Sequence, residues 1–320
     1  MRNEVKYLVI RGRVSPPAQH KNVNKSKPKI IVILGQTATG KSELAVKLAK
    51  QFGGEIISAD SRQVYKGLDI GSGKITKKEM RGVSHHLLDV ANPKRKFSVA
   101  QYKKLADKKI AEIHKPQKVP IIVGGTGFYI QAIVDNLILP AVMPNYTLRK
   151  KLEKKSTYEL FAMLKKLDPN RADEIEKDNP RRLIRAIEIA RELGKVPKLK
   201  TLPKYDALQI GLKLTDEKLK KKIHTRLIAR MRKGMVSEVE RLHSKGLSWK
   251  RLEALGLEYR YLALYLQKKL GKQEMLSKLG IEIRRFAKRQ MRWFKRDKRI
   301  RWFKPNETRK IEKEIKKFLK

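Results

Sequence analysis

The sequence contains no cysteine, and this absence excludes several chemistries at once. Disulfide cross-links, a thiol nucleophile and cysteine-ligated zinc or iron–sulfur sites all need a residue that the chain lacks. The chain also has no uninterrupted apolar run close to the ~20 residues that cross a membrane. We therefore expect a soluble protein of a reducing compartment, the cytoplasm, with no membrane partner.

Acidic residues are scarce relative to basic ones. The chain has 32 Asp and Glu against 78 Lys and Arg, which gives a formal net charge of +46 at pH 7. Such an excess attracts polyanions, and nucleic acid is one class of polyanionic partner. A general lysine bias that only keeps the protein soluble gives the same total. The positions of the basic residues must therefore separate the two interpretations.

The 320 residues are 40% hydrophobic and suffice for one large domain or two ordinary ones. Residues 1–28 are polar and basic without a helical apolar period, and they predict a flexible N-terminal extension. Residues 140–179 are Lys-rich and helical in period with no strand signal, which predicts a helical insertion. We expect residues 29–139 and 180–304 to form the body, followed by a Lys-rich tail at 305–320.

Four short apolar runs predict strands, and helical patterns lie between them. The runs are Ile30–Leu34, Glu55–Ser58, Val119–Val123 and Gln209–Leu214. Strands that alternate with helices form a parallel sheet with helices on its faces. The predicted fold class is therefore α/β, with the helical insertion and a helical C-terminal part added to the sheet.

The turn after the first strand satisfies the phosphate-binding pattern G-x-x-x-x-G-K-[ST] in full. Its residues are Gly35, Gln36, Thr37, Ala38, Thr39, Gly40, Lys41 and Ser42. Backbone N–H groups of such a loop converge on a phosphate, the lysine adds positive charge, and the following helix N-terminus adds its dipole. The Ser42 hydroxyl is suited to Mg²⁺. The pattern predicts a phosphate-binding site on a P-loop NTPase-like parallel sheet.

A generic P-loop NTPase has a strand that ends in an Asp near its metal, and the strand at 119–123 lacks one. That strand ends in Gly124–Gly127, where the backbone could approach a ligand and Thr126 offers a hydroxyl; a plain strand–helix turn explains these residues equally well. Asp60 follows the strand at 55–58 instead, on the P-loop side of the sheet, and suits metal or proton chemistry. Its alternative role is to close a local turn.

Basic and aromatic residues alternate from Arg284 to Lys304. On a helix they would separate into a basic face with Arg285, Lys288, Arg292 and Lys295 and an apolar face with Ile283, Ala287, Met291 and Phe294. The basic face is suited to RNA or DNA phosphates, whereas the aromatic residues are as well suited to a core as to base stacking. A second basic cluster lies beside the insertion, at residues 181–185.

Taken in order, five segments resemble tRNA dimethylallyltransferases, also called tRNA isopentenyltransferases. They are Gly-Gln-Thr-Ala-Thr-Gly-Lys-Ser (35–42), Asp-Ser-Arg-Gln-Val-Tyr-Lys-Gly-Leu-Asp-Ile-Gly (60–71), Ser-His-His-Leu-Leu-Asp (84–89), Gly-Gly-Thr-Gly-Phe-Tyr-Ile (124–130) and Asn-Pro-Arg-Arg-Leu-Ile-Arg-Ala-Ile-Glu (179–188). Their order and spacing match across about residues 29–304. The Asp-Ser-x-Gln-Val-Tyr stretch after a P-loop is the most discriminating of them.

The resemblance implies transfer of the dimethylallyl group of dimethylallyl diphosphate to N6 of the adenosine immediately 3′ of the tRNA anticodon. In that family the P-loop holds the diphosphate of the donor. By the same analogy Asp60 is the general base and Thr126 contacts the reacting nucleotide or the bridging oxygen. Lys41 and Arg226 would neutralise the diphosphate, with Arg230 on the same helical face as the alternative to Arg226, and Ser42 would bind Mg²⁺.

The resemblance also implies contacts with the tRNA anticodon stem-loop. The corresponding positions are Asp60, Ser61, Arg62, Gln63, Thr126, Arg149, Arg181, Arg182, Leu183, Ile184 and Arg185. The chain departs from the family pattern at Gln36 and Thr39, where Pro and Ser are more frequent, and in Gly256–Tyr259, where the usual Gly-Tyr pair is altered. We expect a monomer, because one chain suffices to hold an anticodon stem-loop.

Two other functions are compatible with parts of the sequence. A P-loop kinase of a small nucleotide or metabolite would need a lid with convergent arginines and no large positive charge. An RNA-binding protein with a vestigial P-loop would not need the intact pair of Lys41 and Ser42. The Asp60-Ser61-x-Gln63 pattern disfavours the kinase.

Overall fold

The computed structural model describes residues 27–320, so the predicted extension lies outside the described residues apart from its last two positions. Within the described part, six strands form one parallel sheet in the order β3-β2-β4-β1-β5-β6. They are β1 (Lys29–Gly35), β2 (Gly54–Ala59), β3 (His85–His86), β4 (Val119–Gly124), β5 (Asp206–Leu212) and β6 (Arg301–Phe303). The predicted α/β class with a parallel sheet is confirmed. β3 and β6 were not predicted, because strands of two and three residues are too short to show an alternating pattern in the sequence.

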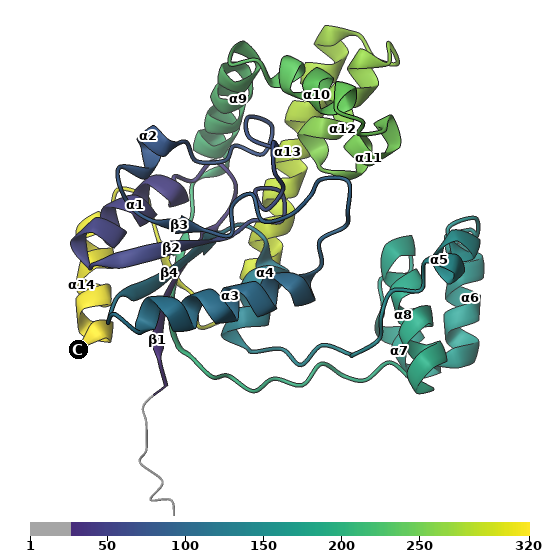
Figure 1. Cartoon of the computed structure of the whole chain (residues 1–320), viewed down its shortest axis with the longest axis horizontal. Coiled ribbons are helices and arrows are strands. Elements are labelled where there is room, and N and C mark those ends of the chain that lie inside the picture. Colours follow the sequence, from purple (N-terminus) through teal and green to yellow (C-terminus); the bar gives the residue numbers. More distant parts are fainter. Residues whose placement is uncertain (1–26) are drawn as a thin grey trace, which may run out of the picture.

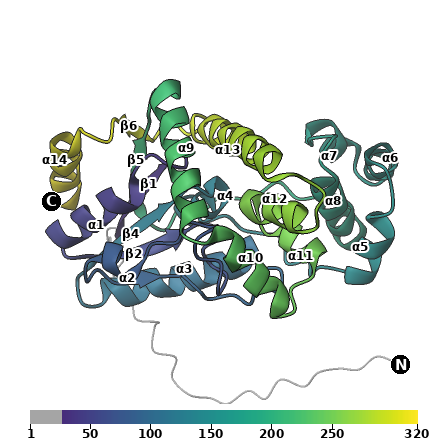
Figure 2. The same cartoon turned by 90° about the horizontal axis from the view of Figure 1, so that it is seen from above.

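Helices cover both faces of the sheet (Figures 1 and 2). One face packs against α1 (Lys41–Gln51) and α14 (Thr308–Leu319), the other against α3 (Val99–His114) and α4 (Gly127–Val134). β1 lies between the two faces and contributes to both cores: alternate residues of its five-residue apolar run belong to one core or the other. A strand buried on both faces must be apolar throughout. A short helix, α2 (Lys77–Met80), precedes β3.

The predicted Lys-rich tail at 305–320 is wrong. Most of this segment is α14, whose Ile311 and Ile315 are fully buried in the core beneath the sheet. The two isoleucines are four residues apart and therefore share one helical face, while lysines occupy the remaining positions. Lys47 of α1 pairs with Glu312 at 3.0 Å. The sequence analysis missed this helix because its apolar face is narrow and most of its other residues are charged.

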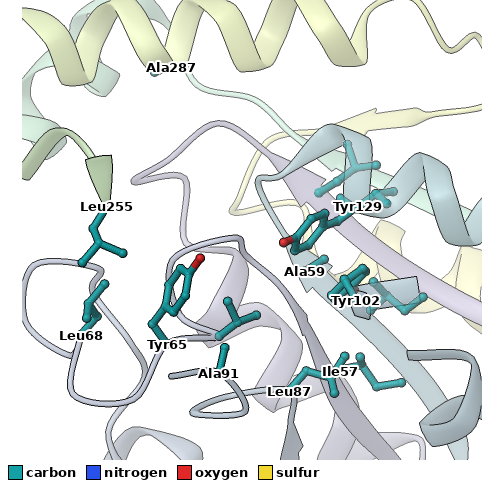
Figure 3. Close-up of a cluster of buried hydrophobic side chains, with 14 of the residues drawn as sticks. Ile57, Ala59, Tyr65, Leu68, Leu87, Ala91, Tyr102, Tyr129, Leu255 and Ala287 are labelled. Carbon is teal, nitrogen blue, oxygen red and sulfur yellow. The ribbon is translucent and has the colours of Figure 1, made fainter. Parts of the chain in front are cut away.

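The helical C-terminal part lies above the carboxyl ends of the strands (Figure 1). Its helices are α9 (Asp216–Arg232), α10 (Met235–Ser244), α11 (Trp249–Ala254), α12 (Leu257–Leu266) and α13 (Lys272–Phe294). Its buried residues continue the core of the sheet. Figure 3 shows Leu255 beside Leu68, and Tyr65 near Tyr129, within this one cluster. The helices thus form a wall fixed to the strand ends.

The insertion is helical as predicted, but its boundary at 179 is wrong. Its helices are α5 (Tyr146–Leu152), α6 (Thr157–Leu167), α7 (Pro169–Glu174) and α8 (Pro180–Leu193). Leu183 and Ile187 of α8 are fully buried against Leu160 and Leu164 of α6 in a separate small core. The three shorter helices alone leave this apolar face uncovered, so α8 belongs to the insertion and not to the body.

Two extended linkers join the insertion to the body (Figure 1). They pair where they leave the body. Ile138 forms an antiparallel bridge with Lys200, and the Leu202 N–H donates to the Asp135 carbonyl at 3.1 Å. The Asn136 side chain donates to the Leu202 carbonyl at 2.7 Å. Among residues 27–320 no helix is both long and apolar enough to cross a membrane.

Candidate active site

A cavity of about 1070 Å³ opens at the carboxyl ends of the strands, below the C-terminal helices. It brings together the P-loop, the segment after β2, the turn after β4 and residues of α9, α12 and α13. The sequence-predicted residues that line it are Thr37, Ala38, Thr39, Gly40, Lys41, Ser42, Asp60, Ser61, Arg62, Gln63, Thr126, Arg181 and Arg226. Carboxyl ends of parallel strands are the usual ligand-binding edge of such sheets.

The P-loop leaves the N-terminus of α1 open toward this cavity. Gly40, with φ of 90°, precedes α1, and no side chain caps its first turn. Uncapped N–H groups at a helix start bind anions. Gly35 is required for packing, because a Cβ there would lie 2.4 Å from the Leu212 carbonyl oxygen of β5. Gln36 is buried behind the loop and does not line the cavity.

Lys41 is a proton-sensitive cation in this cavity. Its Nζ donates to the Gln36 carbonyl at 2.5 Å. Burial, reinforced by the positive charge of Arg226 and opposed by Asp60, lowers the Lys41 pKa to about 7. A phosphate ligand would reverse the repulsion between Lys41 and Arg226 by placing negative charge between them.

Arg226 and Arg230 differ in their partners. Loss of surrounding water in the cavity and the charge of Arg230 lower the Arg226 pKa to about 10, although the side chain still reaches solvent at the mouth. Arg230 lies 3.5 Å from a carboxylate oxygen of Glu258 and 3.5 Å from the Gly71 carbonyl. Within residues 27–320, Arg226 makes no comparable side-chain contact. Arg226 therefore lines the cavity near Lys41 without a carboxylate partner among the described residues.

Asp60 closes a local turn and also lines the cavity. Its Oδ1 accepts hydrogen bonds from the Arg62 N–H at 2.8 Å and the Gln63 N–H at 3.3 Å, which closes a turn. Oδ2 takes no part in these two bonds. The structural interpretation is confirmed, because the turn fixes one oxygen and so orients the other within a site that Asp60 lines; metal or proton chemistry at Asp60 stays a prediction.

Thr126 connects the two strand ends. Its Oγ1 accepts the Ser61 N–H at 3.0 Å, and its own N–H donates to the Ala59 carbonyl at 3.2 Å. Thr126 thus lies directly against the segment that carries Asp60. The arrangement places one hydroxyl and one carboxylate on adjacent turns of the same cavity wall.

The glycines of the turn after β4 are required by neighbouring protein atoms. A Cβ at Gly124 would lie 2.2 Å from the Ala59 carbonyl oxygen, and one at Gly125 would lie 2.3 Å from Nε2 of Gln290. A Cβ at Gly127 would lie 2.2 Å from the Trp293 ring. Two of these three contacts come from α13, so close packing on this helix accounts for the glycines without a ligand.

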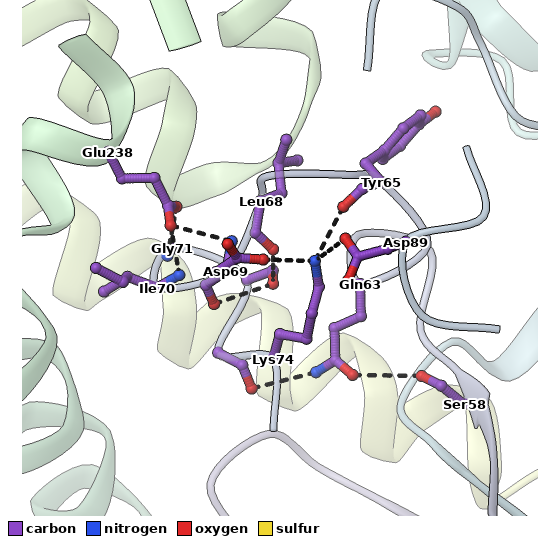
Figure 4. Close-up of polar contacts among 12 residues, drawn as sticks. Ser58, Gln63, Tyr65, Leu68, Asp69, Ile70, Gly71, Lys74, Asp89 and Glu238 are labelled. Carbon is purple, nitrogen blue, oxygen red and sulfur yellow. Dashed lines mark hydrogen bonds and ion pairs between the residues drawn. The ribbon is translucent and has the colours of Figure 1, made fainter. Parts of the chain in front are cut away.

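Hydrogen bonds hold the loop after Asp60 in place (Figure 4). The buried Glu238 carboxylate of α10 accepts the N–H groups of residues 69, 70 and 71 at 2.6–3.0 Å. Lys74 binds Asp69 at 2.6 Å and Asp89 at 2.5 Å. The Gln63 amide is likewise engaged, with Ser58 Oγ and the Gly73 carbonyl each at 3.3 Å. Gln63 therefore shapes the loop, and any RNA contact by its side chain must compete with these bonds.

Glu258 is a further carboxylate of the cavity, beside Asp60, Glu43 and Glu79, and the sequence analysis did not identify it. It lies in the first turn of α12 beside Arg230. Burial raises its pKa, and the charge of Asp60 adds to this effect while Arg230 opposes it. The only signal in the sequence was the altered Gly256–Tyr259 segment.

The predicted RNA-contacting residues of the insertion divide into three groups. Arg181 lines the cavity, and the neighbouring Arg182 is exposed. Leu183 and Ile184 are buried in the insertion core, so their side chains pack within the insertion, and RNA contact by this segment stays a prediction.

Arg149 and Arg185 are bound to the same carboxylate. Glu188, nearly fully buried, accepts two hydrogen bonds from Arg149 at 2.6 and 2.8 Å and one from Arg185 at 3.4 Å. Neither arginine lines the cavity. Arg149 thereby links α5 to α8, whereas Arg185 lies on α8 with Glu188 and also donates to the Val142 carbonyl before α5 at 2.8 Å. The sequence pattern did not predict these structural roles.

Comparison with known proteins supports the sequence resemblance. The IPP transferase family model matches residues 63–297. The tRNA dimethylallyltransferase of Halothermothrix orenii is 38% identical over 318 residues, covering 95% of this chain and 97% of the relative. That of Carboxydothermus hydrogenoformans is 41% identical over 286 residues, covering 86% and 91%.

Solved structures show the same likeness. The full-length tRNA isopentenylpyrophosphate transferase of Bacillus halodurans has a TM-score of 0.71 and 34% identity, covering 92% of this chain and 97% of that one. A eukaryotic dimethylallyltransferase acting on tRNA has a TM-score of 0.75 and 26% identity, covering 87% of this chain and 74% of that one. The cavity brings the P-loop together with Asp60 and Thr126. With these matches, the chain belongs to the IPP transferase family.

Proposed function

We propose that this chain transfers the dimethylallyl group of dimethylallyl diphosphate to N6 of the adenosine 3′-adjacent to the tRNA anticodon. The products are N6-dimethylallyladenosine in tRNA and diphosphate. The observation that carries the proposal is a single cavity in which a P-loop with two cations adjoins a carboxylate and a hydroxyl. The relatives named tRNA dimethylallyltransferase support the same reaction.

The donor diphosphate would lie on the P-loop. Lys41, Arg226 and the open N-terminus of α1 provide positive charge where the leaving group gains negative charge. An exocyclic adenine amine is a weak nucleophile, so stabilisation of the leaving group should contribute most to the lower barrier. The allylic C–O bond breaks as the new C–N bond forms, and the diphosphate takes the bonding electron pair.

Asp60 would accept the proton that N6 loses. Its Oδ1 is held by the turn at Arg62 and Gln63, so the carboxylate cannot rotate away from the cavity without breaking both bonds. A base held in place is what general-base catalysis requires. Thr126 Oγ1 accepts the Ser61 N–H, which directs its own O–H toward another acceptor. We assign that acceptor to an oxygen of the donor diphosphate.

Mg²⁺ fits the donor set around Ser42. Residues 27–320 contain no cluster of three or more His, Asp or Glu side chains able to hold a metal alone. Mg²⁺ keeps several water ligands and commonly binds through substrate phosphates, so a single protein hydroxyl beside a diphosphate suits it. The ion would supply further positive charge against the departing diphosphate, and Ser42 would be its ligand from the chain.

The partner that we propose is the tRNA anticodon stem-loop, bound by a monomer in the cytoplasm, where tRNA is found. The target base must leave the loop to reach a cavity of this depth. Arg181 of the insertion and Arg289 of α13 line the cavity from two sides and are placed to hold the RNA backbone near the flipped base. Arg285, Lys288 and Arg292 of the same helix are exposed.

One assay tests the proposal directly. Purified protein, Mg²⁺, unmodified tRNA with adenosine 3′ of the anticodon and radiolabelled dimethylallyl diphosphate are incubated, beside an identical reaction with Asp60→Asn. We expect label in tRNA with the unaltered protein only. Consumption of the ATP γ-phosphate without RNA, and no labelled tRNA, would instead establish the small-molecule kinase, which the family match does not favour.

A further inference from the structure

Gln290 on α13 connects two loops that both line the cavity, the P-loop after β1 and the turn after the neighbouring strand β4. Its side chain is only 7% exposed. Oε1 accepts the Thr37 N–H of the P-loop at 2.8 Å, and Nε2 donates to the Gly125 carbonyl in the turn after β4 at 2.9 Å. Both ends of one buried amide are therefore used, and each end holds a different loop of the site.

A second glutamine adds another bond between the P-loop and α13. Gln36, in the P-loop and 3% exposed, donates from Nε2 to the Ala287 carbonyl of α13 at 3.2 Å. The P-loop thus donates two hydrogen bonds to α13, one from the Thr37 N–H and one from the Gln36 side chain. This contact depends on Gln36, one of the positions where the chain departs from the family pattern. The two bonds attach the P-loop to α13 at points less than one helical turn apart.

The turn after β4 is fitted to the same helix. Gly125 leaves no space for a Cβ beside the Gln290 amide, and Gly127 leaves none beside Trp293. Thr126 lies between these two glycines. Its hydroxyl position is therefore set by how the turn packs on α13, and the position of the P-loop is set by the same helix. α13 is the element common to both.

We propose that Gln290 is a positioning residue that fixes the distance between the donor-binding loop and Thr126. This inference rests on the proposed function for its kinetic consequence, although the connection itself can be measured without the reaction. A shift of about 1 Å between reacting groups can reduce a rate roughly 100-fold. Loss of the amide should therefore slow transfer strongly while leaving the fold intact.

The test uses two variants and a matched control. Gln290→Met keeps the length of the side chain and removes both hydrogen bonds, and Gln290→Asn keeps an amide too short to reach both loops. The control is Gln209→Met, because Gln209 is also a buried glutamine whose Nε2 donates to a side chain, Asp297 at 2.9 Å, but it does not line the cavity. If Gln290→Met does not fold, Gln290→Asn carries the test.

The first readouts do not depend on the reaction. In hydrogen exchange, we expect the segments at 35–42 and 124–128 to exchange faster together in the Gln290 variants and to be unchanged in Gln209→Met. Calorimetry with magnesium pyrophosphate should show weaker binding to the Gln290 variants than to the control. Unchanged exchange in either segment, or changes equal to those of the control, would overturn the proposal.

The kinetic readout separates the two proposals. With unmodified tRNA and dimethylallyl diphosphate, Gln290→Met should lower kcat at least roughly tenfold while the dissociation constant for tRNA stays within twofold. A folded variant with unaltered kcat would reject the role of Gln290. If the unaltered protein itself transfers no prenyl group, the proposed function fails, and the exchange and pyrophosphate measurements still decide whether Gln290 connects the loops.

Discussion

The backbone N–H of Ser61 donates a 3.0 Å hydrogen bond to Oγ1 of Thr126. This bond joins the residue after Asp60 to the turn after β4, two segments separated in sequence by the whole of α3. Because Oγ1 is an acceptor in this bond, the Thr126 O–H remains a donor for a ligand. One hydroxyl can therefore tie the carboxylate-bearing turn in place and also contact the diphosphate.

Replacement of Thr126 should show whether its hydroxyl is needed for the reaction or whether the residue only fills space. Thr126→Val keeps the shape of the side chain but leaves the Ser61 N–H without its acceptor and removes the donor. We expect kcat for transfer to fall roughly 100-fold, as for loss of one donor to a developing anion. Thr126→Ser should recover most of the rate, measured in single-turnover reactions. Equal rates for the two variants would contradict this role.

Asp60→Asn should remove the base and preserve the turn, because an amide oxygen can still accept the N–H groups of Arg62 and Gln63. We expect kcat to fall about 100- to 10,000-fold, with pyrophosphate binding nearly unchanged. Asp206→Asn is the matched control, since Asp206 is exposed at the opposite edge of the sheet. A variant that retained a tenth or more of the rate would show that another group accepts the proton.

Donor binding should weaken as the pH rises above 7. The Lys41 pKa is lowered to about 7, so the amine loses its charge above that pH in the ligand-free protein. A bound diphosphate favours the charged form, and binding at pH 8 should therefore take up a proton. Affinity should fall by up to about tenfold per pH unit above the pKa.

The measurement is calorimetry of magnesium pyrophosphate binding in buffers of different ionisation enthalpy. Lys41→Arg is the control, because a guanidinium stays charged throughout this range and leaves only the proton uptake of the ligand itself. The same proton uptake by the unaltered protein and by Lys41→Arg would show that Lys41 is already charged before the ligand binds.

Arg226 and Arg230 should respond differently to replacement. Arg226→Gln should raise the inhibition constant for product pyrophosphate at least tenfold, about 1.4 kcal/mol or more, because it removes a cation beside Lys41. Arg230→Gln should alter this constant less, since Arg230 already pairs with Glu258 at 3.5 Å. Product-inhibition kinetics on both variants check the assignment. The reverse order of effects would assign the leaving group to Arg230.

Glu188→Ala should destabilise the insertion without affecting the donor site. It leaves Arg149 and Arg185 without their shared carboxylate partner. Breaking a buried pair costs ~3–5 kcal/mol, and we expect somewhat less here because the arginines retain contact with solvent. Hydrogen exchange should accelerate in α5 and α8, while the pyrophosphate dissociation constant stays unchanged. A weakened pyrophosphate affinity would show that the insertion supports the P-loop.

Much of the site could be predicted because its chemistry is carried by short continuous segments. The P-loop from Gly35 to Ser42 has a fixed spacing and lies between a strand and a helix. Asp60 and Thr126 each follow a predicted strand directly, and the carboxyl ends of parallel strands meet at one edge. The sheet itself followed from the alternation of apolar runs with helical patterns.

Other features could not be predicted because they depend on contacts between distant segments. Glu258 reaches the cavity only after α12 has packed against the loop after Asp60, and the altered Gly256–Tyr259 segment does not by itself indicate this. The membership of α8 in the insertion depends on the apolar face of α6. Gly125 was equally compatible with a ligand and with a plain turn, and only the position of Gln290 explains it.

The paired linkers at the base of the insertion have a consequence for how this enzyme could be divided. Asn136 and Leu202 are in direct hydrogen-bond contact, so the chain leaves the body and returns to it at one point. A short turn joining these two positions would close the body without moving any strand of the sheet. The insertion is in this sense a detachable module, and its contribution to tRNA binding can be measured by expressing the body with and without it.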